Sequence, residues 1–227
     1  TNFVFFFFFN VSNNYNLEII YFFLVLSVSF FISLYNDKKE IKPIHRLIIF
    51  YFIFLFWMSL DEQMIINNLE FDFLNLNISL GNYGFLITPL FIVIFLNALN
   101  LFDGVNLQSS SYFSLYFIFF LFNNIDIGAY IFLLVFIVFF SINNFRNKVF
   151  LGDSGITLFA ITISFIIITN YNSIGSLIRC EDVFAMMFLP GIDMLRLYFL
   201  RMSILRKSAR FARRNFFFPN TIGFCRF

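Results

Sequence analysis

The sequence predicts an all-α protein that crosses a membrane several times. Of its 227 residues, 60% are hydrophobic and only 12% are charged, whereas soluble domains carry roughly 25% charged residues. The apolar residues gather in stretches that are separated by short polar segments, as in membrane helix bundles. The net charge of +2 argues against the broad basic face of a nucleic-acid-binding protein. We therefore expect one integral membrane domain, residues 1–227, in a lipid bilayer and without a nucleic-acid partner.

Seven apolar stretches are the predicted spans. They cover residues 17–35, 47–60, 84–102, 111–122, 127–142, 156–169 and 183–200. Several are short against the ~20 residues of a straight crossing. Residues 17–200 form the expected transmembrane core, which follows the end of an earlier helix in 1–16 and precedes a basic cytoplasmic tail in 201–227. Between the second and third spans, alternating apolar and polar residues predict a short external hairpin within 61–83.

Basic residues set the expected orientation. They gather at 38–46, at 146–148 and beyond 200, regions that share one side if seven spans alternate, and basic loops face the cytoplasm. Most acidic residues fall on the opposite side, but Asp37, Asp103 and Asp153 fall on the basic side. A divalent metal bound together with phosphate would explain acids at that position. The alternative is that each Asp merely neutralises a nearby Lys or Arg.

The polar stretch 97–106 lies where the third span meets its first carboxylate. Asn97, Asn100 and Asp103 follow one another in steps of three residues, so they share or adjoin one helical face. Clustered polar groups at the end of an apolar helix suggest a binding site, because polar side chains at membrane depth need partners. An ordinary helix end, capped by Asn, Asp and Gly, is the alternative.

Two further cytoplasmic segments carry carboxylates. Asp37 is followed by Lys38 and Lys39, which offer a metal ligand next to two phosphate-binding ammonium groups, although a basic loop with a helix cap has the same composition. Asp153 follows Gly152 at the start of an apolar helix. It is either an N-cap or a metal ligand near a helix N-terminus, where a glycine lets a diphosphate approach the backbone.

Together, these segments resemble the polyprenyl-phosphate N-acetylhexosamine-1-phosphate transferases of glycosyltransferase family 4. The matching segments are Asn36-Asp37 with Arg46-Leu47, 97–106, 150–155, and 190–193 with Arg196 and Arg201. The chain departs from the family pattern at Asn36 and Asn106, where the family has Asp. It also lacks the family's C-terminal histidines, since His45 is the only histidine. These departures leave a catalytically degenerate relative open as an alternative, beside a non-enzymatic membrane transporter.

The resemblance implies a reaction and a set of site residues. Polyprenyl phosphate would attack a UDP-N-acetylhexosamine, releasing UMP with the help of Mg²⁺, or of Mn²⁺ as an alternative, to start a cell-envelope glycan such as O-antigen, teichoic acid or peptidoglycan. It implies Asp37, Asp103 and Asp153 as catalytic residues, with Asp153 and Asp103 on the metal. The implied substrate-binding residues are Asn97, Asn100, Lys38, Lys39, Gly152, Asp193, Arg196 and Arg201.

Three of these assignments have simpler alternatives. Asp193 and Arg196 also fit a plain ion pair within one helix, Lys39 fits a solvated lysine, and Arg201 fits an anchor at the membrane interface. The resemblance further implies a multi-pass protein of the bacterial inner membrane with its active site facing the cytoplasm. A homodimer stays open as its assembly.

Overall fold

Seven α-helices account for the fold among the residues that the computed structural model describes. These are residues 15–39, 41–73, 75–103, 107–123, 127–146, 149, 151–173 and 178–217, without the side chains of 15–16, 127–133, 201 and 203–217. The helices are α2 (Tyr15–Lys38), α3 (Pro43–Leu60), α4 (Gly84–Phe102), α5 (Gln108–Phe122), α6 (Ile127–Phe145), α7 (Gly152–Asn172) and α8 (Cys180–Phe217). Each predicted apolar stretch falls within one of them, which confirms the polytopic helical bundle.

Five helical segments of this described part are long and apolar enough to cross a membrane. They are Leu17–Lys38, Pro43–Leu60, Gly81–Phe102, Gly152–Asn172 and Cys180–Leu200. Helix α5 has 15 residues and is therefore about 22 Å long, less than the ~30 Å of a hydrocarbon core. In α6, the described side chains form a shorter apolar stretch, Leu134–Phe145. The protein is thus a membrane protein, with its strongest spans in α2, α3, α4, α7 and α8.

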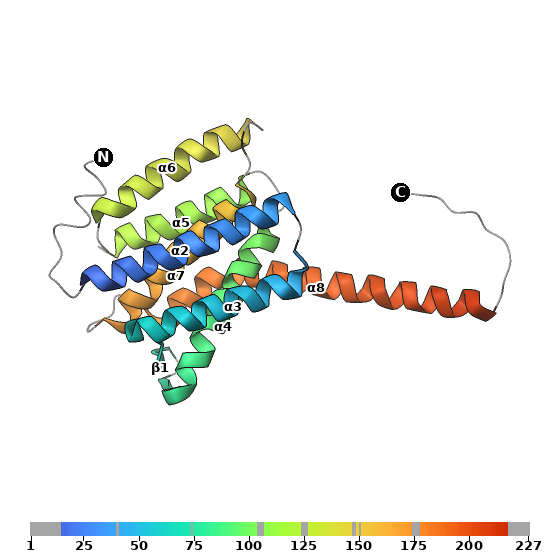
Figure 1. The fold of residues 1–227 in the computed structure, drawn as a ribbon, viewed down its shortest axis with the longest axis horizontal. Helices are drawn as coiled ribbons and strands as arrows, with labels where there is room; N and C mark the ends of the chain where they lie inside the picture. Colours follow the sequence, from blue (N-terminus) through green and yellow to red (C-terminus); the bar gives the residue numbers. More distant parts are fainter. Residues whose placement is uncertain are drawn as a thin grey trace.

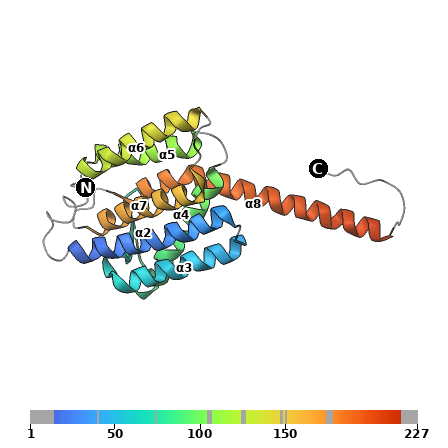
Figure 2. The same ribbon diagram turned by 45° about the horizontal axis from the view of Figure 1, so that its top comes forward.

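Helices α4 and α7 form the centre of the bundle. About half of the apolar part of each is buried, 50% in α4 and 56% in α7, against 22% in α2 and in α3. Helix α7 packs against α2 and α4, and α4 also packs against α3 and α8. The rings of Phe22 and Phe165 stack at 4.4 Å between centroids, and Trp57 lies 6.1 Å from Phe165, which joins α2, α3 and α7. The α5–α6 pair forms an outer layer (Figures 1 and 2).

The predicted hairpin is present at one end of the bundle, the hairpin end. Strands β1 (Asn68–Phe71) and β2 (Leu76–Ser79) pair antiparallel, with Leu69 opposite Ile78. The Tyr171 hydroxyl of α7 accepts the Glu70 N–H at 3.0 Å and donates to the Asn68 carbonyl at 2.9 Å. These bonds fasten the hairpin to the end of a central helix.

The opposite end, the site end, brings together the end of α2, the beginning of α3, the end of α4 and the beginning of α7. Pro43 starts α3 at a position where a missing N–H costs nothing. Helix α8 passes this end and continues well beyond the bundle (Figure 1). The predicted polar segments around Asp37, Asp103 and Asp153 therefore meet at one end, although they are far apart in the sequence.

Candidate functional site

Asp37 caps the N-terminus of α7. Its Oδ1 accepts the backbone N–H of Asp153 at 3.0 Å and its Oδ2 accepts that of Ser154 at 3.2 Å. These N–H groups belong to the first turn of α7, where they lack helical partners and the helix dipole favours a negative charge. The residue predicted from sequence as a catalytic carboxylate therefore uses both of its oxygens to join α2 to α7.

Gly152 makes this cap sterically feasible. Its φ is +66°, a left-handed conformation, and a Cβ at this position would lie 3.3 Å from Oδ2 of Asp37. An L-residue with a side chain would be strained here and would press on the capping carboxylate. Sequence analysis predicted Gly152 as a substrate-binding residue, and the structure places its Cα directly against Asp37.

Asp153 is held by two donors from other helices. Its Oδ2 accepts Nη1 of Arg46 and Nδ2 of Asn36, each at 2.5 Å. The Arg46 side chain is only 14% exposed, so this ion pair is shielded from water and screened little by salt. Asn36 also accepts the Ile41 N–H at 2.9 Å through its Oδ1. The hydrogen bonds among the described residues use only Oδ2 of Asp153, which leaves Oδ1 for a ligand.

Asp103 follows the last residue of α4 and lies at the site end, as Asp153 does. Burial raises the pKa of Asp103, the nearby Ser109 hydroxyl lowers it, and the negative charge of Asp153 raises it further. An ionised Asp103 is therefore costly in this position unless a cation compensates for it.

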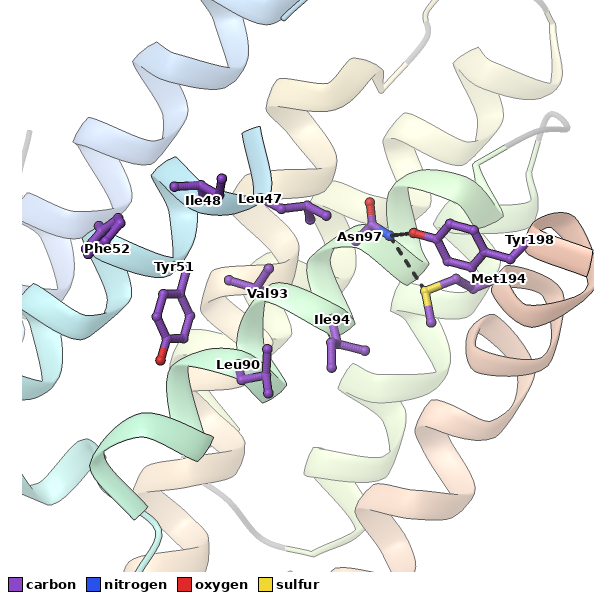
Figure 3. A pocket seen from close by; sticks show the side chains of 10 residues that line it. All are labelled: Leu47, Ile48, Tyr51, Phe52, Leu90, Val93, Ile94, Asn97, Met194 and Tyr198. Atoms are coloured by element: carbon purple, nitrogen blue, oxygen red, sulfur yellow. Dashed lines mark hydrogen bonds between the residues drawn. The ribbon is translucent and has the colours of Figure 1, made fainter. Parts of the chain in front are cut away.

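Asn97 and Asn100 face different surroundings. Asn97 is 7% exposed, and its Nδ2 donates to Oη of Tyr198 at 3.1 Å, with Sδ of Met194 at 3.6 Å (Figure 3). Both amide atoms of Asn100 are buried and have no hydrogen-bond partner among the described residues. A buried amide without partners costs about 1–3 kcal/mol. The described surroundings of Asn100 thus leave both of its amide atoms unsatisfied.

An apolar groove lies between α3, α4 and α8. It has a volume of about 400 Å³, with Leu47 and Ile48, Leu90, Val93 and Ile94, and Met194 among its walls. Asn97 contributes an amide to the lining, which is otherwise mostly aliphatic and aromatic (Figure 3). The groove can accommodate a hydrocarbon chain with a polar head at Asn97.

The remaining predicted site residues lie on α2 and α8. Lys38 and Lys39 are exposed at the end of α2, next to Asp37. Asp193 and Arg196 form an i,i+3 ion pair at 2.7 Å on α8, the simpler of the two arrangements considered from sequence. No described bond joins this pair to Asp37, Asp103 or Asp153. The side chain of Arg201 lies outside the described residues, as do residues 104–106, 148 and 150 of the predicted motifs and 1–14 and 218–227 at the two ends.

A divalent cation fits the donors that are present. Among the described residues, no group of three His, Cys, Asp or Glu side chains surrounds a common point. Mg²⁺ does not need such a group, because it is commonly bound by one or two carboxylates together with substrate phosphates and water. Asp153, through its free Oδ1, and its neighbour Asp103 provide that number of carboxylates.

Four functional positions were missing from the predicted site residues. Arg46 and Asn36 bind Asp153, Tyr198 binds Asn97, and Asn144 accepts the Leu107 N–H at 2.7 Å and donates to the Val149 carbonyl at 2.8 Å. Arg46 and Asn36 could have been found, since both belong to the motif segments. No local signal marks Tyr198 or Asn144, because their partners are distant in the sequence or lie in irregular loops.

Comparison with known proteins places this architecture in a family. A family model described as glycosyl transferase family 4 matches residues 19–171, more than half of the chain. No curated protein and no solved structure matches it. The matched region includes Asp37, Asp103 and Asp153 together with the helices that carry them, α2, α4 and α7. The chain therefore belongs to glycosyl transferase family 4 and is a membrane-bound transferase of the polyprenyl-phosphate sugar-phosphate type.

Proposed function

We propose that the protein transfers N-acetylhexosamine-1-phosphate from a UDP-sugar to polyprenyl phosphate and releases UMP. The observation that carries this proposal is the Arg46–Asp153 ion pair at the same end of the bundle as Asp103, together with an apolar groove that Leu47, the residue after Arg46, helps to line. Such a place suits a substrate with an anionic head and a long hydrocarbon chain. It also suits the diphosphate of the second substrate, once a cation compensates for the carboxylates.

The reaction exchanges one phosphorus–oxygen bond for another. An oxygen of the lipid phosphate attacks the β-phosphorus of the UDP-sugar, and the bond from this phosphorus to the bridging oxygen breaks, so that UMP leaves. Phosphate monoesters have a second pKa near 6, so the nucleophile is already ionised at neutral pH and needs no strong base. Catalysis then depends mainly on positioning and on charge stabilisation.

The residues have distinct proposed roles. Asp153 and Asp103 would hold Mg²⁺ or Mn²⁺, which neutralises the diphosphate charge when bound. Asp37 keeps the start of α7, and with it Asp153, in place through its two backbone hydrogen bonds. Asn100 supplies an unpaired amide for the sugar or the uridine. Lys38 and Lys39, exposed beside Asp37, attract the anionic substrates.

The groove between α3, α4 and α8 would receive the first part of the polyprenyl chain. Its apolar lining runs along α4 from Leu90 to Asn97, and burial of hydrocarbon against it stabilises the complex by about 25 cal/mol per Å² of apolar surface. Asn97 then marks the boundary between the lipid chain and its phosphate. Arg196, paired with Asp193 on α8, and Arg201 are proposed as further phosphate contacts.

We place the site end at the cytoplasmic face of a bacterial inner membrane. The support is the gathering of Lys and Arg in 38–46 and beyond 200, together with the rule that basic loops stay in the cytoplasm. UDP-sugars are cytoplasmic compounds, so the donor would reach Asp153 from that side. The product would start a cell-envelope glycan, with N-acetylglucosamine favoured over the muramyl pentapeptide as the sugar.

An assay of UMP release tests the proposal. Purified protein in nanodiscs is supplied with UDP-N-acetylglucosamine, undecaprenyl phosphate and Mg²⁺, and wild type is compared with Asp153→Asn. We expect UMP release that needs all three components and falls at least 100-fold in the variant. The exposed, hairpin-end Glu62→Gln is the matched control and should leave the rate unchanged. Folded wild-type protein that releases no UMP with this or other UDP-N-acetylhexosamines would refute the transferase and favour a non-catalytic lipid-phosphate binder.

A further inference from the structure

Asn36 makes two hydrogen bonds of opposite polarity. Its Nδ2 donates to Oδ2 of Asp153 at 2.5 Å, and its Oδ1 accepts the Ile41 N–H at 2.9 Å. A carboxamide offers both a donor and an acceptor here, whereas the ionised carboxylate of an Asp would have acceptors alone. The same Asp153 oxygen accepts Arg46. The side chain at position 36 thus donates a hydrogen bond to the carboxylate of Asp153.

A carboxylate at position 36 would meet Asp153 at very short range. With the present geometry, two ionised oxygens would replace the donor and acceptor that now lie 2.5 Å apart, and like charges at that distance repel strongly. The surrounding charges compensate a second carboxylate only in part. Arg46 is already paired with Asp153 through the same oxygen, and Lys38 and Lys39 are exposed and make no described bond to Asp153.

We propose that Asn36 is a positioning residue of the transferase, and that with Arg46 it holds Asp153 by one oxygen so that the other is presented to the metal. The metal in this inference rests on the proposed function. The hold of Asn36 and Arg46 on Asp153, which we call the clamp, does not. It reverses the simplest interpretation of the sequence, in which Asn36 is a lost carboxylate. If Asn36 is a lost carboxylate, Asn36→Asp should strengthen metal binding at the site. If Asn36 positions Asp153, the same substitution should weaken metal binding.

The experiment compares metal binding by matched variants of the full chain. Mn²⁺ is titrated into protein in nanodiscs with UDP-N-acetylglucosamine present to supply the diphosphate, and free Mn²⁺ is measured by electron paramagnetic resonance. We expect Asn36→Asp and Asn36→Leu to weaken Mn²⁺ binding about tenfold, as is typical when a group that orients a metal ligand is changed. Asn143→Asp is the control: Asn143 is partly exposed at the same end and its described side-chain bond stays within α6, so the variant adds the same charge without touching Asp153.

A second measurement reads the clamp without any metal. The midpoint of thermal unfolding is determined for Asn36→Leu, Arg46→Lys and the double variant. Because both residues hold the same oxygen of Asp153, we expect the double variant to differ from the sum of the single effects by about 2 °C or more. This cycle also decides the matter if Asn36→Asp fails to fold.

The outcomes separate the clamp from the proposed function. Mn²⁺ binding to Asn36→Asp that equals or exceeds that of wild type would overturn the inference, as would additive effects in the unfolding cycle. Wild-type protein that binds no Mn²⁺ would instead refute the metal role of the proposed function, and a non-additive cycle would then still support the hold on Asp153. Weaker Mn²⁺ binding in both Asn36 variants, with an unchanged control, would establish Asn36 as a positioning residue.

Discussion

Replacing Gly152 with alanine should destabilise the protein through two separable effects. The first is backbone strain, because the φ of +66° costs a residue with a Cβ about 1–2 kcal/mol. The second is pressure on Asp37, whose Oδ2 would lie 3.3 Å from the new Cβ. Loosening the Asp37 cap on α7 costs about 0.5–2 kcal/mol. Together we expect a loss of about 2–3 kcal/mol, or roughly 4–12 °C in the unfolding midpoint for a chain of this size.

Gly81→Ala separates the two effects. Gly81 has a φ of +50°, but a Cβ there would meet no atom within 4 Å, so this variant reports the strain alone. The midpoints of both variants are measured by thermal unfolding in the same nanodiscs. We expect Gly152→Ala to be worse by about 1 kcal/mol, and this excess should vanish when Asp37→Ala is present in both backgrounds. Equal losses for the two glycines would refute the cap that joins Asp37 to α7.

Three further predictions concern other parts of the molecule. Because the pKa of Asp103 is raised in the folded state, its negative charge destabilises the fold at pH values above that pKa, and it has no effect at pH values below the ordinary pKa of an Asp. Asp103→Asn should therefore raise the unfolding midpoint at neutral and basic pH but not in acid, and it should abolish UMP release. Ile94→Trp should partly fill the groove and raise the KM for undecaprenyl phosphate roughly tenfold, whereas Leu86→Trp, exposed on the same helix outside the groove, should not. Tyr171→Phe, which loses the hydrogen bonds to the hairpin, should lower stability by about 1–2 kcal/mol with an unchanged rate of UMP release. A flat pH dependence, an equal KM increase in both Trp variants, or a Tyr171→Phe midpoint like that of wild type would contradict the respective argument.

The bundle was predictable because its signals are local. Runs of apolar residues mark helices whatever their neighbours are, and alternation in 61–83 predicted a short hairpin, in which the structure pairs Leu69 with Ile78. Basic residues at 38–46 and 146–148 predicted that Asp37 and Asp153 lie on one side of the membrane. In the structure both residues lie at the site end, where the Asp37 carboxylate accepts the backbone N–H of Asp153.

The division of labour among the site residues could not be predicted in the same way. Asp37 and Asp153 have the same side chain and both lie in predicted cytoplasmic segments, yet one caps a helix and the other receives Arg46. That difference depends on which carboxylate reaches the first turn of α7. The packing of the helices decides this, and the spacing of residues in the sequence does not predict it. Asn97 and Asn100 likewise belong to one three-residue spacing pattern. Asn97 nevertheless has a partner, Tyr198 of α8, about a hundred residues away in sequence, whereas Asn100 has none among the described residues.

Helix α6 packs mainly against α5 and carries none of the proposed site residues, yet Asn144 connects it to residues on either side of the proposed metal ligands. Its carboxamide accepts the N–H of Leu107, four residues after Asp103, and donates to the carbonyl of Val149, four residues before Asp153. One side chain of the outermost layer thus holds Leu107 and Val149 close to each other. Removing α5 and α6 would remove this connection, even though all of the proposed chemistry lies on other helices.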